Sequence, residues 1–343
     1  MRFEAMMNKF SPVEKAPLPA RFVTFRRGRL EAAGQDVTMT VILALVVIAL
    51  IVIANPLTKD VFFTSNNLTN LMRQMTTTGL LSLGMLFVIL TGGIDLSVGS
   101  VVAFSAIFAA GSSVFWGLPV WVSFLLGIAT GAGWGLISGS LVAWFKLAPF
   151  VVTLAMMTTI RGLTYVYSEI AVSTRTVPSF TALGSAMVFG IPISTMIMAV
   201  FFALGAVFLN RTPLGRSTIA IGGNRDTVRL AGISVEKGII TAYVISGICA
   251  GTGGILLASR LGNIQPSLGN SFELDAIAAC VIGGANLAGG KGTVRGTVMG
   301  VLILAVMNNL LSLRNVESYW QSVLKGVIIM AVVLLHSRSQ KRW

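Results

Sequence analysis

The chain has few charged residues. Only 11% of its 343 residues are Asp, Glu, Lys or Arg, whereas hydrophobic residues make up 55% and the mean hydropathy is +0.84. A soluble globular domain carries about 25% charged residues. The scarcity of charge excludes an ordinary soluble domain and indicates an integral membrane protein.

Cysteine and histidine are almost absent. Cys249 and Cys280 lie inside apolar runs, which excludes a disulfide scaffold and a four-ligand zinc site. The single histidine, His336, follows the last apolar run and is better placed for the membrane interface than for metal binding. No nucleophile, base and orienting acid occur together. The sequence therefore predicts no catalytic residue and no metal site, and we do not expect an enzyme.

Acidic residues are also scarce, since 12 acidic residues face 25 basic ones and the net charge is +13. Such a charge could indicate nucleic-acid binding, but the basic residues are scattered over short loops and tails rather than gathered on one amphipathic face. We therefore expect no nucleic-acid partner. Scattered Lys and Arg are typical of loops that set the orientation of a protein in the bilayer.

Long apolar runs fill the rest of the chain and predict an all-α membrane protein of about ten spans, because about 20 mostly apolar residues cross a bilayer. Six spans precede residue 210 and four follow residue 238, between basic tails at 1–36 and 337–343; we expect the first tail to be partly disordered. The eighth span is short and ends in glycine, which is typical of a broken helix. The predicted spans are 37–54, 68–90, 96–113, 118–145, 150–168, 191–209, 239–259, 274–284, 293–311 and 319–335.

The distribution of basic residues predicts the orientation of these spans in the membrane. If the amino terminus is cytoplasmic, 18 of the 25 Lys and Arg residues fall on inside segments and four on outside segments, while Arg73, Arg161 and Lys325 lie within spans. Cytoplasmic segments of membrane proteins carry the excess of positive charge. With ten spans, both termini are predicted to be cytoplasmic.

Two stretches of the sequence resemble one another. Residues 131–145 and 292–306 share a glycine-rich pattern, and each precedes a span with a basic residue followed by glycine, at Arg161 and Lys325. The matching spans are five apart and so opposite in orientation, which predicts inverted-repeat halves, a common plan of transporters. A second, shorter match pairs residues 92–96 with 283–287 on the same side of the membrane.

The only long internal segment rich in charge, residues 210–238, divides the two apolar blocks. Asn224 can cap a short helix that continues to Leu230, and Gly232 can end it. So short a helix is unstable alone in water, so we expect it to pack against a partner protein. The alternative is an ordinary cytoplasmic loop whose Arg residues only set topology.

Asp95 is the most informative polar residue, because it lies between two long apolar runs. An unpaired carboxylate is costly there, so we expect it to accept hydrogen bonds from the backbone, to pair with a cation or to line a wet cavity. Ser97 can cap the helix that follows. Asp95 either pins a helix junction or contacts substrate. Arg161 and Lys325 are either structural partners of buried acceptors or linings of the pathway.

The glycine-rich segment 283–293 resembles a phosphate-binding loop but lacks its pattern. Ala285 stands where a glycine is needed before Gly290 and Lys291, and Gly292 stands in place of Ser or Thr. A glycine hinge between two spans explains the segment better. Just before it, Glu273 and Asp275 begin the eighth span on the predicted outer side, where they are candidates for contact with a receptor protein.

Four longer runs carry a family resemblance. LTGGIDLSVGS (90–100), PFVVTLAMMTTIRGLTYVY (149–167), AIGGNRDTVRLAGI (220–233) and ELDAIAACVIGGANLAGGKGTVRGT (273–297) resemble runs in permease subunits of ribose-type ATP-binding-cassette (ABC) importers. The resemblance covers about residues 40 to 335. It implies a protein of the bacterial inner membrane that pairs with a second permease copy or homologue, sits on cytoplasmic ATPase subunits and receives a sugar from a periplasmic binding protein. ATP and Mg²⁺ would bind the ATPase, and this chain would hold no cofactor.

The resemblance also implies roles for residues. The coupling helix that contacts the ATPase would comprise Gly222, Gly223, Asn224, Arg225, Val228, Arg229, Leu230 and Gly232. A path for a neutral, hydroxyl-rich sugar should offer small polar groups; the candidates are Asp95, Ser97, Thr153, Thr158, Arg161, Asn308 and Asn309, although the Thr and Asn residues also suit helix packing.

Two other classes of protein remain alternatives. An ion-gradient-driven secondary transporter of a small polar solute would use Asp95, Arg161 and Lys325 as a relay, but would have no use for a coupling helix. A membrane enzyme acting on lipid-linked sugars would need a reactive carboxylate cluster, for which Glu273 and Asp275 are too isolated.

Overall fold

The structure, a computed structural model, describes the backbone of residues 20–317, 319–327 and 330, and the side chains of these ranges from residue 38 onward. The chain divides into two units, residues 1–42 and 43–343. The first unit is described from Ala20, where helix α1 (Ala20–Leu57) begins. The predicted tail is therefore helical from Ala20 on, and its first 19 residues lie outside the described residues. The carboxy-terminal tail and His336 lie outside the described residues.

The second unit is almost entirely helical, as predicted. Two small antiparallel strand pairs join its loops, β1 (Val172–Ser173) with β4 (Asn263–Ile264) and β2 (Met187–Val188) with β3 (Ile191–Pro192). The helices after α1 are α2 (Ser65–Leu90), α3 (Val98–Val114), α4 (Val120–Trp144), α5 (Pro149–Tyr167), α6 (Pro178–Ser185), α7 (Ile193–Arg211), α8 (Pro213–Gly223), α9 (Arg225–Leu230), α10 (Val235–Leu261), α11 (Phe272–Ile282) and α12 (Val294–Leu313), and residues 319–327 are also helical.

The predicted spans correspond to helices, but not all of these helices can cross a bilayer alone. Seven are long and apolar enough: residues 38–57 of α1, and α2, α4, α5, α7, α10 and α12. α3 has 17 residues and α11 has 11, which at 1.5 Å per residue is about 26 and 17 Å. The tenth span is described only over 319–327 and 330. α6 and α8 were not predicted.

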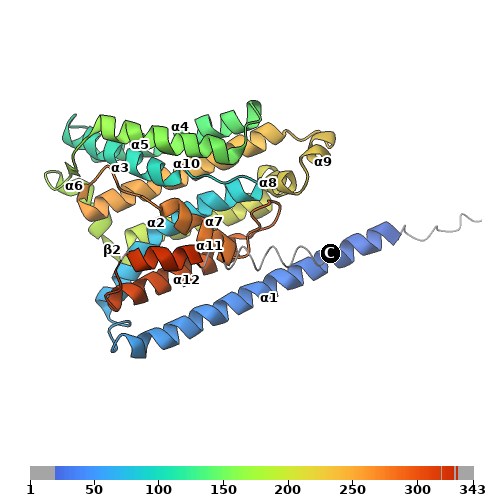
Figure 1. Cartoon of the computed structure of the whole chain (residues 1–343), viewed down its shortest axis with the longest axis horizontal. Coiled ribbons are helices and arrows are strands. Elements are labelled where there is room, and N and C mark those ends of the chain that lie inside the picture. Colours follow the sequence, from blue (N-terminus) through green and yellow to red (C-terminus); the bar gives the residue numbers. More distant parts are fainter. Residues whose placement is uncertain (1–19, 318, 328–329, 331–343) are drawn as a thin grey trace, which may run out of the picture. The chain divides into compact units, whose positions relative to one another are not determined.

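Helix α10 is the centre of the second unit and packs against α2, α3 and α4 (Figure 1). Glycines at four-residue spacing on α4 face glycines of α10: Gly131 lies against Gly247, and Gly127 against Gly251. A Cβ atom on Gly131 would overlap the Gly247 carbonyl, so the two backbones touch. The close approach predicted from the glycine spacing is confirmed.

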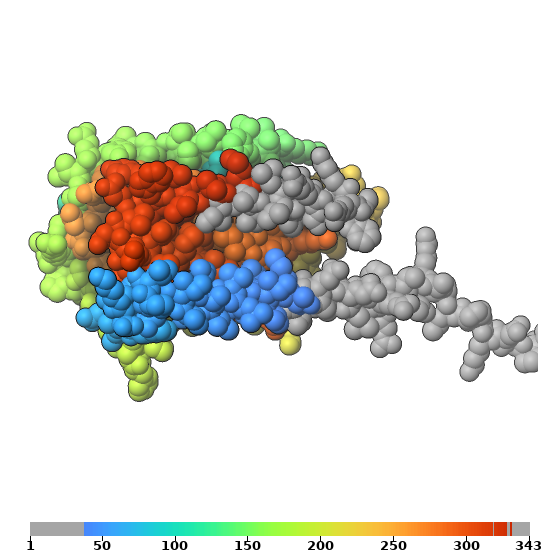
Figure 2. Space-filling model, turned by 60° about the horizontal axis from the view of Figure 1, so that its bottom comes forward, coloured from blue at the N-terminus to red at the C-terminus, as the bar shows by residue number. Residues whose placement is uncertain are grey.

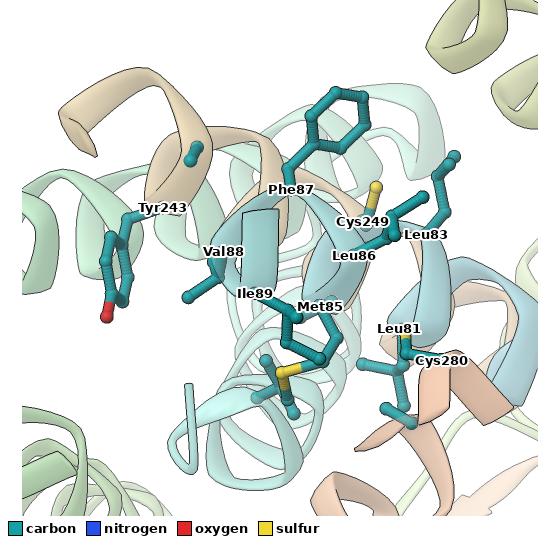
Figure 3. Packing of buried hydrophobic residues seen from close by; sticks show 14 of the residues in the cluster. Leu81, Leu83, Met85, Leu86, Phe87, Val88, Ile89, Tyr243, Cys249 and Cys280 are labelled. Atoms are coloured by element: carbon teal, nitrogen blue, oxygen red, sulfur yellow. The ribbon is translucent and has the colours of Figure 1, made fainter. Parts of the chain in front are cut away.

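Helix α2 supplies the rest of the core. From Leu80 to Leu90 every residue is buried, which is the pattern of a helix enclosed on all sides. Figure 3 shows its apolar side chains beside Tyr243 and Cys249 of α10 and Cys280 of α11. Both cysteines are buried free thiols. α4, α5 and α7 instead leave most of their apolar length exposed, as expected of helices that face lipid.

Helices α2 and α10 are each followed by the same sequence of elements. Segment 91–97 joins α2 to the short helix α3, and segment 262–271 joins α10 to the short helix α11. The two long helices run antiparallel, because Gly84 lies against Ser246 while Gly253 lies against Thr77. This inverted arrangement agrees with the predicted inverted-repeat halves. It also relates the short helices α3 and α11 to one another.

The contact between α4 and α10 can be tested with two alanine substitutions. Gly131→Ala should lower stability by about 1–3 kcal/mol, because the added methyl group overlaps α10. Gly133→Ala is the control: a Cβ there meets nothing within 4 Å, so the helix propensity of alanine should leave stability unchanged or raise it by up to about 1 kcal/mol. Thermal unfolding of the purified chain measures both. Equal unfolding temperatures for the two variants would contradict the packing.

Candidate functional site

Helix α9 lies at one end of the helix bundle, opposite the end that carries α6 (Figure 1). The side-chain oxygen of Asn224 accepts a hydrogen bond from the Thr227 amide at 2.9 Å. At the other end Gly232 adopts φ +75° and donates its amide to the Arg229 carbonyl at 3.0 Å. The short helix predicted between Asn224 and Gly232 is confirmed with both of its terminating residues.

The two faces of α9 differ in exposure. Val228 is buried against the bundle, whereas Leu230 is 90% exposed. A 3.0 Å ion pair between Arg229 and Glu236 ties α9 to the first turn of α10. Since the helix is fixed on one side, Leu230 is presented outward as an apolar group available to a partner protein.

Arg225 does not point outward with Leu230. Its guanidinium donates a hydrogen bond to the Thr91 carbonyl at 3.2 Å, where segment 91–97 leaves the end of α2. Among the residues assigned to the coupling helix, Arg225 therefore connects α9 to the membrane-embedded part of the chain.

Glycine residues beneath α9 bring three distant segments into backbone contact. Gly222 lies in the last turn of α8, Gly92 follows α2, and Gly289 belongs to the loop between α11 and α12. A Cβ atom on Gly289 would lie 2.9 Å from the Cα atoms of both Gly222 and Gly92, and the Gly290 amide donates to the Leu90 carbonyl at 3.0 Å. The runs 92–96 and 283–287, predicted to share a membrane side, thus lie at the same end of the bundle.

Asp95 is 2% exposed and accepts three hydrogen bonds. The amide and hydroxyl groups of Ser97 donate to Oδ1 at 3.0 and 2.6 Å, and the Ser246 hydroxyl donates to Oδ2 at 2.9 Å. The predicted backbone donor is confirmed. The capping role of Ser97 was wrong in part: it occupies the N-cap position of α3, but its hydroxyl binds Asp95 and caps no helix amide.

The contact with Ser246 locates Asp95 along the bundle. Ser246 is 11 residues from the start of α10, or about 17 Å at 1.5 Å per residue, which is near the middle of this long helix. Segment 91–97 therefore turns back into the bundle, and the hydroxyl of Thr153 on α5 fixes it by donating to the Ile94 carbonyl at 3.0 Å. Helix α3 begins inside the protein rather than at its end.

Segment 262–271 enters the bundle from the opposite end. Residues 266–271 of this segment form turns, and Arg161 on α5 fixes them by donating to the carbonyls of Pro266 and Leu268 at 2.8 and 2.7 Å. Arg161 thus takes the first of its two predicted alternatives, a structural partner of buried acceptors. Gly99, in the first turn of α3, lies against the Gly269 backbone and the Glu273 carboxylate, so the starts of α3 and α11 meet inside the protein.

The path of segment 262–271 places the two carboxylates elsewhere than expected. Glu273 and Asp275 were predicted on the outer surface as receptor contacts, but Glu273 is half-buried beside Gly99 and Asp275 is 7% exposed. Asp275 pairs with Lys325, whose ammonium lies 2.8 Å from Oδ1. Asp275 is therefore not on the surface, because the chain runs into the bundle over residues 262–271 before α11 begins. Contact of Glu273 with a receptor protein stays a prediction.

The remaining pathway candidates lie apart from this centre. Asn309 is buried and exchanges hydrogen bonds of 2.8 and 3.1 Å with Asn67 of α2, which is a packing contact. Asn308 has a buried side-chain oxygen without a partner among the described residues. Thr158 is exposed on α5, and its hydroxyl donates to the Ala155 carbonyl at 2.8 Å. The structure therefore groups Asp95, Ser97 and Thr153, but not the others.

Two residues of the centre were not predicted from the sequence. Ser246 and Tyr243 lie within the apolar run of α10, and no motif in the sequence marks them as different from the other residues of that run. The Tyr243 hydroxyl is buried without a partner among the described residues. It lies beside Gly93, in segment 91–97, two residues before Asp95. Figure 3 shows this side chain at the edge of the apolar cluster.

The arrangement indicates the class of protein. Two short helices begin in the interior, and the amino-terminal end of a helix favours negative charge. The chain's own carboxylates already occupy these ends, Asp95 at α3, and Glu273 and Asp275 at α11. Interrupted helices that meet inside inverted halves are the architecture of membrane transport proteins.

Comparison with known proteins identifies the family. Residues 67–333 match the family described as "Branched-chain amino acid transport system / permease component", and the chain belongs to this family. It is the permease subunit of an ABC importer, a multi-pass protein of the inner membrane and a transport protein rather than an enzyme.

Individual relatives match over most of their length. The ribose import permease protein RbsC of Bacillus subtilis (strain 168) is 44% identical over 271 residues, covering 78% of this chain and 84% of the relative. RbsC of Escherichia coli (strain K12) is 40% identical, covering 85% and 92%, and the D-allose transport system permease protein AlsC of the same strain is 38% identical, covering 84% and 89%. No solved structure matches the chain. The resemblance to ribose-type permeases is confirmed.

The role of Asp95 can be tested by two substitutions. Asp95→Ala leaves three buried donors without an acceptor, so stability should fall by about 1–3 kcal/mol or more, and Asp95→Asn, which keeps one acceptor oxygen, should lose less. Thermal unfolding measures the difference, with the exposed Asp60→Asn as the control. Wild-type stability of Asp95→Ala would show that the carboxylate does not pin the junction.

The pair of Lys325 and Asp275 allows a double-mutant cycle. Lys325→Met leaves a buried carboxylate unpaired and should destabilise the chain by about 3–5 kcal/mol, and adding Asp275→Asn should recover most of the loss. The exposed pair of Arg229 and Glu236 is the control, with an expected coupling energy below about 1 kcal/mol. Additive effects of the two buried substitutions would show that the residues do not interact.

Proposed function

We propose that the chain translocates a small neutral sugar, using ATP hydrolysed by a separate cytoplasmic ATPase that docks on α9. The observation that carries this proposal is α9 itself, a capped helix fixed to the bundle on one side with Leu230 exposed on the other. A docking surface of this kind suits a permease driven by a separate motor. The names of the ribose and allose relatives supply the class of substrate.

A neutral substrate agrees with the charges of the interior. The family description names branched-chain amino acids, which carry both a carboxylate and an ammonium group and would need charged partners. The described interior offers few: Asp95 is satisfied by two serines, Lys325 is paired with Asp275, and Arg161 is bound to carbonyl groups. Sugar hydroxyl groups need only neutral donors and acceptors.

We assign the α9 end to the cytoplasm. Basic residues gather in the segments at this end, including Lys146 after α4, Lys291 before α12 and the cations of residues 210–238, in keeping with the excess of positive charge on the cytoplasmic side. Both termini would then be cytoplasmic, and the opposite end would receive sugar from a periplasmic binding protein. A second permease copy or homologue would complete the path.

The glycine contact suggests how motion travels. ATP binding would close the ATPase and move α9, and the backbone contact of Gly222, Gly92 and Gly289 would pass this motion to the segments leading to α3 and α11. The two short helices would shift between inward-open and outward-open packings. This chain would bind no cofactor, with ATP and Mg²⁺ held by the ATPase.

The ion-gradient alternative loses support. Its relay would require Asp95, Arg161 and Lys325 to exchange protons or ions in sequence. In the described residues each has a separate set of partners, and none of the three bonds to another. A specific observation favouring an ion-driven carrier is therefore lacking.

Transport by the reconstituted complex tests the proposal. Vesicles that contain the permease, its ATPase and its soluble binding protein should accumulate labelled ribose or allose when supplied with ATP. Replacing Arg225 and Leu230 by Ala should reduce uptake at least ten-fold and leave ATP hydrolysis running, because the helix loses both its inner bond and its exposed contact. The purified permease alone should show no ATPase activity.

Two controls separate the possible outcomes. Arg211→Ala removes an exposed cation at the same end but outside α9, and uptake should stay within about two-fold of the unchanged protein. Accumulation of labelled leucine instead of sugar would refute the substrate class, and unchanged uptake in the α9 variant would refute the docking role.

A further inference from the structure

Two arginines meet at the end of the bundle opposite α9. Arg73 lies in α2 and Arg260 precedes the last residue of α10, and both line one small cavity. The hydroxyl-bearing residues Thr76, Thr77 and Ser194 line the same cavity. Neither arginine has a part in the transport site described above.

Neither positive charge is neutralised within the described residues. Arg260 makes no hydrogen bond or ion pair there, and the one hydrogen bond of Arg73 goes from Nη2 to the Ser185 carbonyl at 3.0 Å. The Nε atom of Arg73 is buried and has no hydrogen-bond partner in the part of the chain that the structure describes. Two like charges beside one cavity repel each other, and a bound anion would remove this cost.

Helix α7 gives the depth of the cavity in the bilayer. Ser194 belongs to the first turn of α7, a largely lipid-exposed helix of 19 residues. Its length of about 29 Å matches the hydrocarbon layer of about 30 Å. The first turn of α7 therefore lies at the rim of this layer, the level at which lipid phosphate groups begin.

An apolar hairpin next to the cavity supports contact with lipid. Strands β2 and β3 follow Ser185 and lead into α7. The turn between them carries Phe189, which is 99% exposed, with Met187 and Ile191 more than 40% exposed beside it. Figure 2 shows this yellow-green segment projecting from the surface. No charged residue occurs between residues 176 and 210, so the tip suits the bilayer interface rather than water.

We propose that Arg73 and Arg260 bind the phosphate group of an anionic phospholipid. The guanidinium groups would contact the phosphate oxygens, and the hydroxyl group of Ser194 would donate a further hydrogen bond. The acyl chains would lie along the apolar hairpin. Arginine suits this role because its planar fork matches phosphate geometry. The site does not depend on which substrate the permease carries.

Lipid binding to the purified full-length chain tests the site. Native mass spectrometry in detergent measures the affinity for phosphatidylglycerol and for phosphatidylcholine, whose choline group offsets its phosphate charge. Phosphatidylglycerol should bind more tightly. Arg260→Gln should weaken its binding about five-fold, which is the contribution of one basic residue at a membrane surface, and should leave phosphatidylcholine binding nearly unchanged. Because Arg260 has no partner to lose in the described residues, the substitution should not disturb the fold.

Two further variants keep the test decisive. Arg175→Gln removes an exposed arginine at the same end of the bundle and should leave the lipid preference as it is. Arg260→Lys retains the charge and should bind within about two-fold of the unchanged protein even if Arg260→Gln folds poorly.

Three results would overturn the proposal. The first is equal phosphatidylglycerol binding by Arg260→Gln and the unchanged chain, and the second is equal affinity for the two lipids. The third is displacement of the lipid by millimolar inorganic phosphate, which would show a site for a free anion. Lipid binding that resists inorganic phosphate, falls in Arg260→Gln and is retained in Arg260→Lys and Arg175→Gln supports a phospholipid site.

Discussion

Non-helical backbone inside a bilayer must find its hydrogen-bond partners within the protein, because the hydrocarbon layer offers none. Segments 91–97 and 262–271 are such backbone, and the rest of the interior is arranged around them. The Asp95 carboxylate accepts the Ser97 amide, Thr153 donates to the Ile94 carbonyl, and Arg161 donates to two carbonyls of the second segment. Without these groups α3 and α11 could not begin inside the bundle.

The same constraint explains why polar residues that look functional are first of all structural. Asp95, Thr153 and Arg161 each satisfy backbone or neighbouring hydroxyl groups, and Asn309 pairs with Asn67. These bonds hold the junction at which the two inverted halves meet. A transporter needs such a junction to be well defined in each of its states, since packed interiors switch between discrete arrangements rather than deform continuously.

Glycine residues also allow close backbone contacts between helices, from the middle of the bundle to the end that carries α9. Along α4 and α10, glycine lets the two helices touch backbone to backbone, which is how helices associate when lipid provides no hydrophobic drive. Beneath α9, glycines from three segments touch in the same manner. A displacement of α9 therefore meets backbone rather than flexible side chains, and we infer that this makes the contact a direct mechanical link.

The sequence alone determined the membrane class, the helical architecture and the capped helix α9, because length, hydropathy and capping chemistry are local properties. It also carried the family resemblance, which the comparisons confirmed. Only the tertiary structure decided that Ser246 faces Asp95, that Asp275 pairs with Lys325, and that Arg73 and Arg260 share a cavity. These contacts join residues 50 to 187 positions apart. These contacts form because the chain turns back inside the bilayer. Tertiary packing stabilises these turns, so no local sequence pattern predicts them.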